Sequence, residues 1–191
     1  LMNYERAASQ PLQKSLKKRL DAHRAASHRI GKRPVESETL SAGLKEALYY
    51  SSWHTAAVHV LTAVPGYQTA VGIAQRLELP SSLVERTLRD LESIGLVQMK
   101  KDKWEVKGGS VHLPKASPLS TINQSNWRDR AIRHLGSNPQ DGIHYSAIFA
   151  LSKKDGERIN KLLQEAIEQV VAVVGPSEEE DIVCMNVDYF P

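Results

Sequence analysis

The stretch that decides the fold runs from residue 67 to residue 108 and reads YQTAVGIAQRLELPSSLVERTLRDLESIGLVQMKKDKWEVKG. In its first part, 68–77, apolar residues recur at close to the spacing of one helix face, and a proline then ends that segment. A second start follows, because Ser82 and Glu85 have the spacing of a capping box. We therefore expect two short helices in succession, the second beginning at Leu83.

The residues after that start complete a recognisable order. Apolar positions of the second helix step by four, three and three, at Val84, Leu88, Leu91 and Ile94. Gly95 then supplies a left-handed stop, and the period changes to two, so that 96–100 and 103–107 read as two strands around a short Lys/Asp turn. Helix, turn, helix and basic hairpin in this order are typical of a winged helix.

A winged helix can place its second short helix in the major groove of DNA while the hairpin lays lysines along the phosphates. On this reading the expected DNA-contacting residues are Ser81, Ser82, Arg86, Arg89, Lys100, Lys101 and Lys103. Acidic residues lie on the same helix, at Glu85, Asp90 and Glu92, so its exposed face is mixed. Since many such modules only hold proteins together, protein contact is the alternative interpretation.

The composition suits an intracellular domain protein. The chain has 191 residues, 41% of them hydrophobic, with a net charge of +3 and a pI near 9.0. Basic residues crowd 14–33, whereas 178–181 are all acidic. Cys184 is the single cysteine and lies in an apolar pattern, so we expect a small core residue in a reducing cytoplasm. No apolar run suggests a membrane span or signal peptide, and the start at Leu1 leaves open a longer parent chain.

The residues before the decisive stretch read as helical. A basic helix is expected over about 12–28, with leucines every fourth residue, and it either packs on protein or lies along nucleic acid. A linker at 31–38 precedes one long helix from Ser41 to Val64. Aromatic residues of that helix are expected in the core, and its histidines are expected to be structural: Tyr49, Tyr50, Trp53, His54 and His59.

The last third alternates between the two element types. A loop at 110–119 reads as a hinge; the segments after it read as helix 120–135, strand 143–151, a Ser152 cap, helix 156–174 and strand 182–190. Two strands make a poor isolated sheet, so we expect another element or a second copy of the chain to complete it. The predicted fold class is α+β, a mostly helical winged-helix domain followed by a small helix-strand-helix-strand module. The expected divisions are 1–40 (basic arm), 41–113 (winged helix) and 114–191 (dimerisation or sensing).

Five separated motifs resemble a family of conserved hypothetical bacterial proteins that are regulator-like. The motifs are Tyr49-Tyr50-Ser51-Ser52-Trp53-His54, Ile73-Ala74-x-x-Leu77, Leu91-x-x-Ile94-Gly95-Leu96, Tyr145-Ser146 and Asn186-Val187-x-x-Phe190-Pro191. The resemblance covers about residues 40–191 and implies transcriptional control. It also implies that longer members carry a lambda-repressor-like helix-turn-helix ahead of this core, and this chain lacks an obvious one.

Enzymatic signals are missing from the sequence. There is no glycine-rich phosphate loop, nucleophile elbow or metal-spaced Cys/His cluster, so we expect no catalytic residues, metal or cofactor. The leading hypothesis is a cytoplasmic bacterial regulator that binds double-stranded DNA and forms a homodimer through its C-terminal module, which alternatively receives a signal. The rival hypothesis is a protein-interaction adaptor whose winged helix does not bind DNA.

Overall fold

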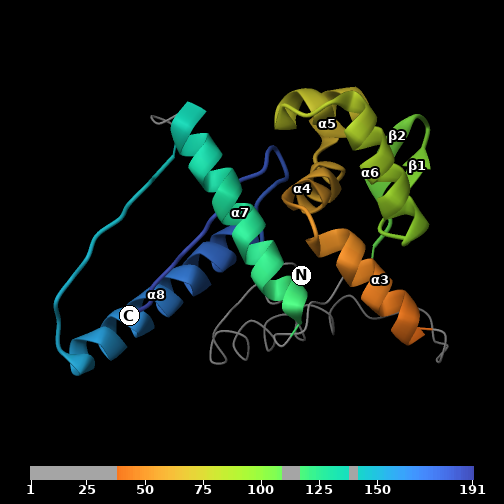
Figure 1. Ribbon diagram of the computed structural model, residues 1–191. Coiled ribbons are helices and arrows are strands. Elements are labelled where there is room, and N and C mark those ends of the chain that lie inside the picture. Colours follow the sequence, from red (N-terminus) through yellow and green to blue (C-terminus); the bar gives the residue numbers. More distant parts are fainter. Residues whose placement is uncertain (1–37, 109–116, 138–141) are drawn as a thin grey trace. The chain divides into compact units, whose positions relative to one another are not determined.

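The computed structural model describes residues 38–108, 117–137 and 142–191 (Figure 1). They are mostly helical and contain one two-stranded antiparallel sheet, which agrees with an α+β class. The basic helix expected at 12–28 lies outside the described residues. Within them, no helix is both long enough and apolar enough to cross a membrane.

The described residues divide between two compact units. One, here called the hairpin unit, comprises Ile30–Arg128 and Glu178–Cys184, and the other, the C-terminal unit, includes Asp129–Ser177 and Met185–Pro191. The elements in chain order are α3 (Glu38–Tyr50), α4 (Trp53–Leu61), the 3₁₀ turn η1 (Pro65–Tyr67), α5 (Ala70–Leu77), α6 (Ser81–Ser93), β1 (Val97–Lys100), β2 (Lys103–Val106), α7 (Pro118–Ser137) and α8 (Lys153–Val174). The range of α7 crosses from the first unit into the second.

The core of the hairpin unit is formed where α4, α5 and α6 meet the hairpin. Ile73, Leu88 and Leu91 are fully buried in one cluster, as the apolar spacing predicts. Local residues define the ends of these short helices. The Thr69 hydroxyl caps the start of α5 by accepting from the Gly72 amide, and Gly95, with a φ of 78°, ends α6. Helix α6 lies beside the hairpin, and α5 packs against α6 (Figure 1).

A backbone hydrogen bond fastens the hairpin to the segment before α5. The strands pair from Val97 with Val106 to Lys100 with Lys103. The amide of Trp104 in β2 also donates to the carbonyl of Gln68, at 2.8 Å. Since Gln68 lies between α4 and α5, this bond fixes the hairpin relative to the helices.

The prediction of one long helix from Ser41 to Val64 is wrong, because the structure has two helices, α3 and α4, in this range. The backbone at Ser52 is extended, with φ −143° and ψ 141°, and it separates α3 from α4. The Asn126 side chain of α7 donates to the Ser51 carbonyl at 2.9 Å, so a distant residue satisfies a backbone group at the break. The core positions expected for Tyr49 and Tyr50 are confirmed.

The start of α7 packs on the hairpin unit. The rings of Trp53 and Trp127 lie edge to face with centroids 6.2 Å apart, and Asn123 is buried. Pro118, expected in a hinge, instead opens α7, where its missing amide hydrogen costs nothing. Residues 110–116 of the expected hinge lie outside the described part of the chain.

In the C-terminal unit α8 forms as expected, with the Ser152 hydroxyl accepting from the Asp155 amide. The strands expected at 143–151 and 182–190 are wrong: both segments run outside any helix or strand. A strand needs a paired ladder for its backbone, and neither segment has one among the described residues. Cys184, expected as a core residue, is exposed.

Candidate nucleic-acid interface

Helix α6 starts two residues earlier than the sequence predicts. It begins at Ser81 with Pro80 at the N-cap, and no side chain caps it. The capping box predicted from Ser82 and Glu85 is therefore wrong. The Pro80 carbonyl instead accepts from the amides of Leu83 and Val84, and the fixed proline φ of −59° sets the entry of the chain.

The exposed face of α6 has basic residues along its middle and acids along its edges. Because successive residues turn by roughly 100°, Ser82, Arg86 and Arg89 fall opposite the buried face that holds Val84, Leu88 and Leu91. The acidic residues Glu85 and Asp90 fall on opposite flanks of that stripe. The mixed composition of the helix thus separates into a central basic stripe with acidic borders.

The hairpin tip presents the predicted lysines. Lys100 ends β1, Lys103 starts β2, and Lys101 and Asp102 form the two-residue turn between them. Both turn residues have positive φ, 49° and 62°, as a type I′ turn requires. All three lysines are exposed, and Lys100 Nζ lies 3.8 Å from Glu105 Oε2.

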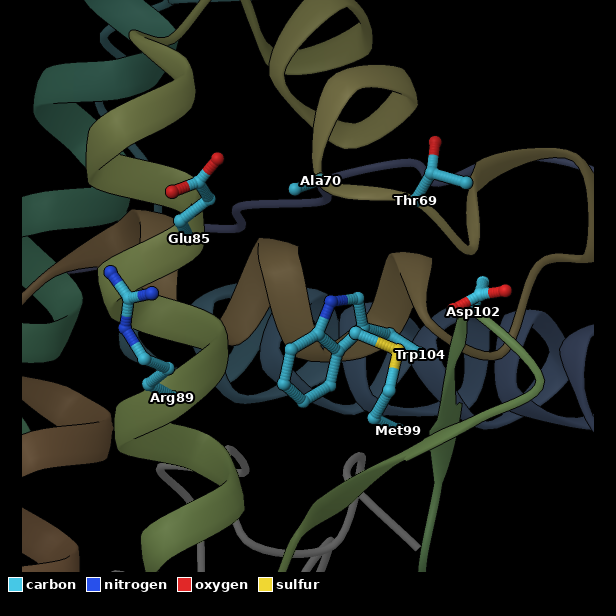
Figure 2. A pocket seen from close by; sticks show the side chains of 7 residues that line it. All are labelled: Thr69, Ala70, Glu85, Arg89, Met99, Asp102 and Trp104. Atoms are coloured by element: carbon cyan, nitrogen blue, oxygen red, sulfur yellow. The ribbon is translucent and has the colours of Figure 1, made fainter.

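A hollow of about 290 Å³ lies between α6, the hairpin and the start of α5 (Figure 2). Its lining residues are Thr69, Ala70, Glu85, Arg89, Met99, Asp102 and Trp104. Figure 2 shows Glu85 and Arg89 on α6 facing the hairpin residues Met99 and Trp104. Arg89, one of the residues predicted to contact DNA, thus lines the same hollow as the hairpin residues Met99 and Trp104. The carboxylates of Glu85 and Asp102 lie in the same lining.

A second hollow, of about 250 Å³, lies on the opposite flank of α6 and includes Arg86, His54 and Asp90 in its lining. Burial lowers the pKa of His54, and the charge of Arg86 lowers it further. Arg86 and His54 thus line the same hollow on this side of the helix. The two predicted arginines therefore share the central stripe of α6, and each lines a different hollow beside it.

The remaining predicted residues lie at the first turn of α6. Ser81 and Ser82 are exposed there, next to amides that an α-helix leaves without internal partners. Among the described residues, Arg86, Arg89, Lys101 and Lys103 form no ion pair. The structure thus gathers the predicted set on α6 and the adjoining hairpin.

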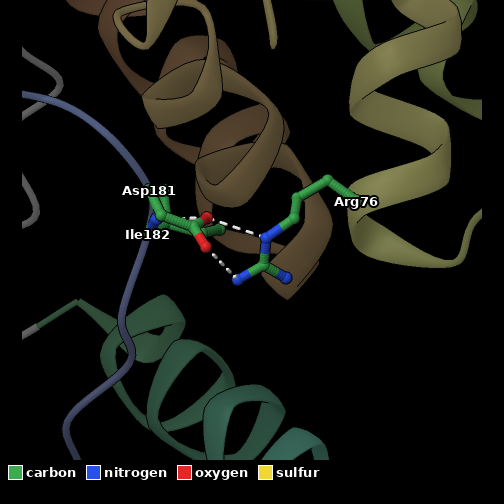
Figure 3. A network of polar contacts seen from close by, with 3 residues as sticks. All are labelled: Arg76, Asp181 and Ile182. Atoms are coloured by element: carbon green, nitrogen blue, oxygen red, sulfur yellow. Dashed lines mark hydrogen bonds and ion pairs between the residues drawn. The ribbon is translucent and has the colours of Figure 1, made fainter. Parts of the chain in front are cut away.

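One contact of the hairpin unit was not predicted. Arg76 of α5 forms a two-pronged ion pair with Asp181, at 2.7 and 2.9 Å (Figure 3). Hydrogen bonds from Arg76 lower the pKa of Asp181, and Asp181 raises the pKa of Arg76. The sequence shows only that 178–181 are acidic, because a partner 105 residues away leaves no local signal.

In the part of the chain that the structure describes, no group of three or more His, Cys, Asp or Glu residues could hold a metal ion. His59 is buried, with its Nδ1 3.0 Å from the Tyr49 hydroxyl, which agrees with the structural role expected for it.

Comparison with known proteins identifies a family. The family described as "Domain of unknown function (DUF4423)" matches residues 31–191, which is most of the chain, and the protein belongs to it. No curated protein and no solved structure matches.

Proposed function

We propose that this member of the DUF4423 family is a bacterial transcriptional regulator-like protein that binds double-stranded DNA through a winged helix. The C-terminal unit serves oligomerisation or signal input. The single observation that carries the proposal is the exposed basic stripe of α6 beside a lysine-tipped hairpin.

The order and pairing of the elements support the winged-helix assignment. Three short helices, α4, α5 and α6, precede the β1–β2 hairpin, and one core holds all of them together. The bond from Trp104 to Gln68 gives the hairpin a third backbone neighbour, placed between the first two of these helices. A winged helix uses that position for the strand that anchors its wing to the helices.

The geometry of α6 suits a recognition helix. It is 13 residues long, so it extends for roughly 20 Å and fits within a major groove. Arg86 and Arg89 offer planar groups for guanine edges or phosphates, and the exposed first turn with Ser81 and Ser82 offers donors to phosphate oxygens.

The hairpin tip suits phosphate contacts. Lys101 and Lys103 extend from a tight turn held by the β1–β2 ladder, so the position of the tip is fixed before any binding. Lysine charges on such a tip neutralise phosphates without reading the base sequence.

The test is duplex binding measured by fluorescence anisotropy. Arg86→Ala and Arg89→Ala should each weaken binding by about 1–3 kcal/mol, because each removes a contact made by the exposed stripe. Arg158→Ala, an exposed arginine on α8, is the matched control and should leave the affinity within about 0.5 kcal/mol. Absence of duplex binding by the wild-type protein at low salt would refute the proposal.

A protein-interaction adaptor is the second candidate function. Met99 is 48% exposed in the hollow that Glu85 and Asp102 border, and an apolar side chain framed by carboxylates suits a basic, apolar peptide better than DNA. For an adaptor, Met99→Glu should abolish capture of a protein partner from cytoplasm, while random duplex shows no binding in a gel shift.

A further inference from the structure

The second hollow beside α6 combines polar groups from two parts of the hairpin unit. Residues from the segment 51–55, where α3 ends and α4 begins, form one wall, and α6 residues that include Arg86 and Asp90 form the other. Its volume of about 250 Å³ lies below the roughly 300–1,000 Å³ of pockets for drug-sized ligands. The hollow therefore suits a ligand with only a few non-hydrogen atoms.

The start of α4 presents hydrogen-bond donors to this hollow. Ser52 is the N-cap of α4, but its side chain makes no capping hydrogen bond, and the first turn of the helix holds no acidic residue. An α-helix leaves its first amides without internal partners, and the positive end of its dipole favours an anion there. Since Ser52, His54 and Thr55 all line the hollow, a negatively charged group in it would meet this end of α4.

A buried side chain at the same place also lacks a partner. Thr55 is only 5% exposed, and its hydroxyl makes no hydrogen bond to any residue that the structure describes. By contrast, the hydroxyl of Thr87, which also lines the hollow, donates to the Leu83 carbonyl at 2.8 Å. A buried hydroxyl without a partner costs free energy, and the hollow is where water or a ligand atom can supply one.

The α6 wall of the hollow carries charges of both signs. Arg86 and Asp90 lie one turn apart and both line the hollow, yet neither forms an ion pair within the described residues. In a helix, a basic residue that precedes an acidic one by four positions pairs less well than the reverse order. The hollow thus offers a cation for a carboxylate and a carboxylate for an ammonium group.

We propose that this hollow binds a small free α-amino acid. The ligand's carboxylate accepts hydrogen bonds from Thr55 and Arg86 at the start of α4, and its ammonium group pairs with Asp90. Leu48 and Leu83, which also line the hollow, contact a short aliphatic side chain. A carboxylate held by Arg86 competes with DNA for that residue, so the ligand weakens duplex binding. This last step rests on the DNA-binding function proposed above.

The first test is calorimetric titration of the whole chain, without DNA, with L-alanine, L-serine, L-valine and L-leucine. At least one of them should bind with a dissociation constant of about 1 mM or below. For the tightest, the matched acid without the amino group and the matched amine without the carboxyl group should each bind at least about tenfold more weakly, because each loses a charged contact. For L-valine these analogues are isovalerate and isobutylamine.

Two variants assign the contacts. Thr55→Val keeps the shape of the side chain and removes its hydroxyl, and Asp90→Asn removes the negative charge. Each should weaken binding of the tightest amino acid about tenfold, since each removes a hydrogen bond to a charged group. Asp90→Asn should leave the affinity for the matched acid unchanged. Glu92→Gln, at an exposed carboxylate of α6 outside the hollow, is the matched control and should bind as the wild type does. Circular dichroism checks that the variants are folded.

A second experiment tests the competition with DNA. A saturating concentration of the tightest amino acid should weaken duplex binding by the wild type at least about fivefold. The same addition should not change duplex binding by Arg86→Ala, because this variant lacks the residue for which the two ligands compete.

Three results would overturn the inference. They are no binding of any of the four amino acids at millimolar concentrations, wild-type affinity in Asp90→Asn, and equal binding of the acids without an amino group. The last would show a plain anion site, such as one for a DNA phosphate. A bound amino acid that leaves duplex affinity unchanged would refute the competition for Arg86. Because the titration contains no DNA, its result is separate from whether the hairpin unit binds a duplex.

Discussion

His59 is the residue at which the fold depends most clearly on protonation. It lies buried against Tyr49, and burial lowers its pKa, although the Leu96 carbonyl partly opposes the shift. Its Nε2 makes no hydrogen bond of good geometry within the described residues, so the Leu96 carbonyl offsets only part of the cost of burying a charged ring. The fold therefore favours the neutral form of His59, which is buried in α4 within the hairpin unit.

This residue predicts how stability changes with pH. The unfolded chain binds the proton more tightly than folded His59, so the stabilisation is complete above the ordinary pKa of about 6.5 and declines as the pH falls below it. Urea unfolding at pH 7.5 and 5.5 should show a smaller loss of stability for His59→Gln than for the wild type. Some loss should persist, because burial also lowers the pKa of His54.

The exposed His144 provides the control for this measurement. His144→Gln should leave the difference between the two pH values as in the wild type. An equal acid loss in His59→Gln and in the wild type would remove the buried imidazole from the explanation.

At the scale of elements, the hairpin has a turn that its own residues fit poorly. Type I′ turns favour Asn or Gly because both central residues have positive φ, whereas this turn uses Lys101 and Asp102. A lysine in this conformation is strained, and Lys101 lies at the tip of the hairpin. Such strain at a projecting residue agrees with a contact role.

Asp102→Gly should therefore stabilise the hairpin unit, by about 0.5–1 kcal/mol in urea unfolding, since glycine adopts a φ near 62° without a Cβ clash. Glu92→Gly within α6 is the matched control and should destabilise by roughly 0.5 kcal/mol through lost helix propensity. A destabilising Asp102→Gly would show that the carboxylate makes a contact that outweighs the strain.

The elements also show where local sequence signals suffice. The periodicity and stop signals predicted α5, α6 and the two strands to within about two residues, and Ser152 predicted the start of α8, because each signal acts within one turn of chain. The break at Ser51 and Ser52 was missed because its partner is Asn126. The strands near the C-terminus were wrong because alternation describes which faces are apolar and cannot supply a neighbouring strand.

At the scale of the whole molecule, the described residues divide into two compact units, and the residues predicted to contact DNA all lie in the hairpin unit. The residues predicted to contact DNA lie on two successive elements, α6 and the β1–β2 hairpin, and this grouping follows from their order in the sequence. The basic stripe and acidic borders of α6 could not be predicted from the sequence with the same certainty, because they are defined relative to the face of the helix that is buried. The Arg76–Asp181 pair, which ties 178–184 to α5, was not predictable, because ion pairs between distant segments leave no periodic signal.

The most direct test of the account is the salt dependence of duplex binding by Lys101→Glu/Lys103→Glu, compared with the wild type. If the hairpin tip neutralises two phosphates, the plot of log affinity against log salt should flatten by roughly two units of slope. Arg133→Glu/Lys153→Glu, which reverses two exposed charges of the C-terminal unit, should keep the wild-type slope. A wild-type slope in the hairpin variant would contradict the claim that this tip lies on DNA.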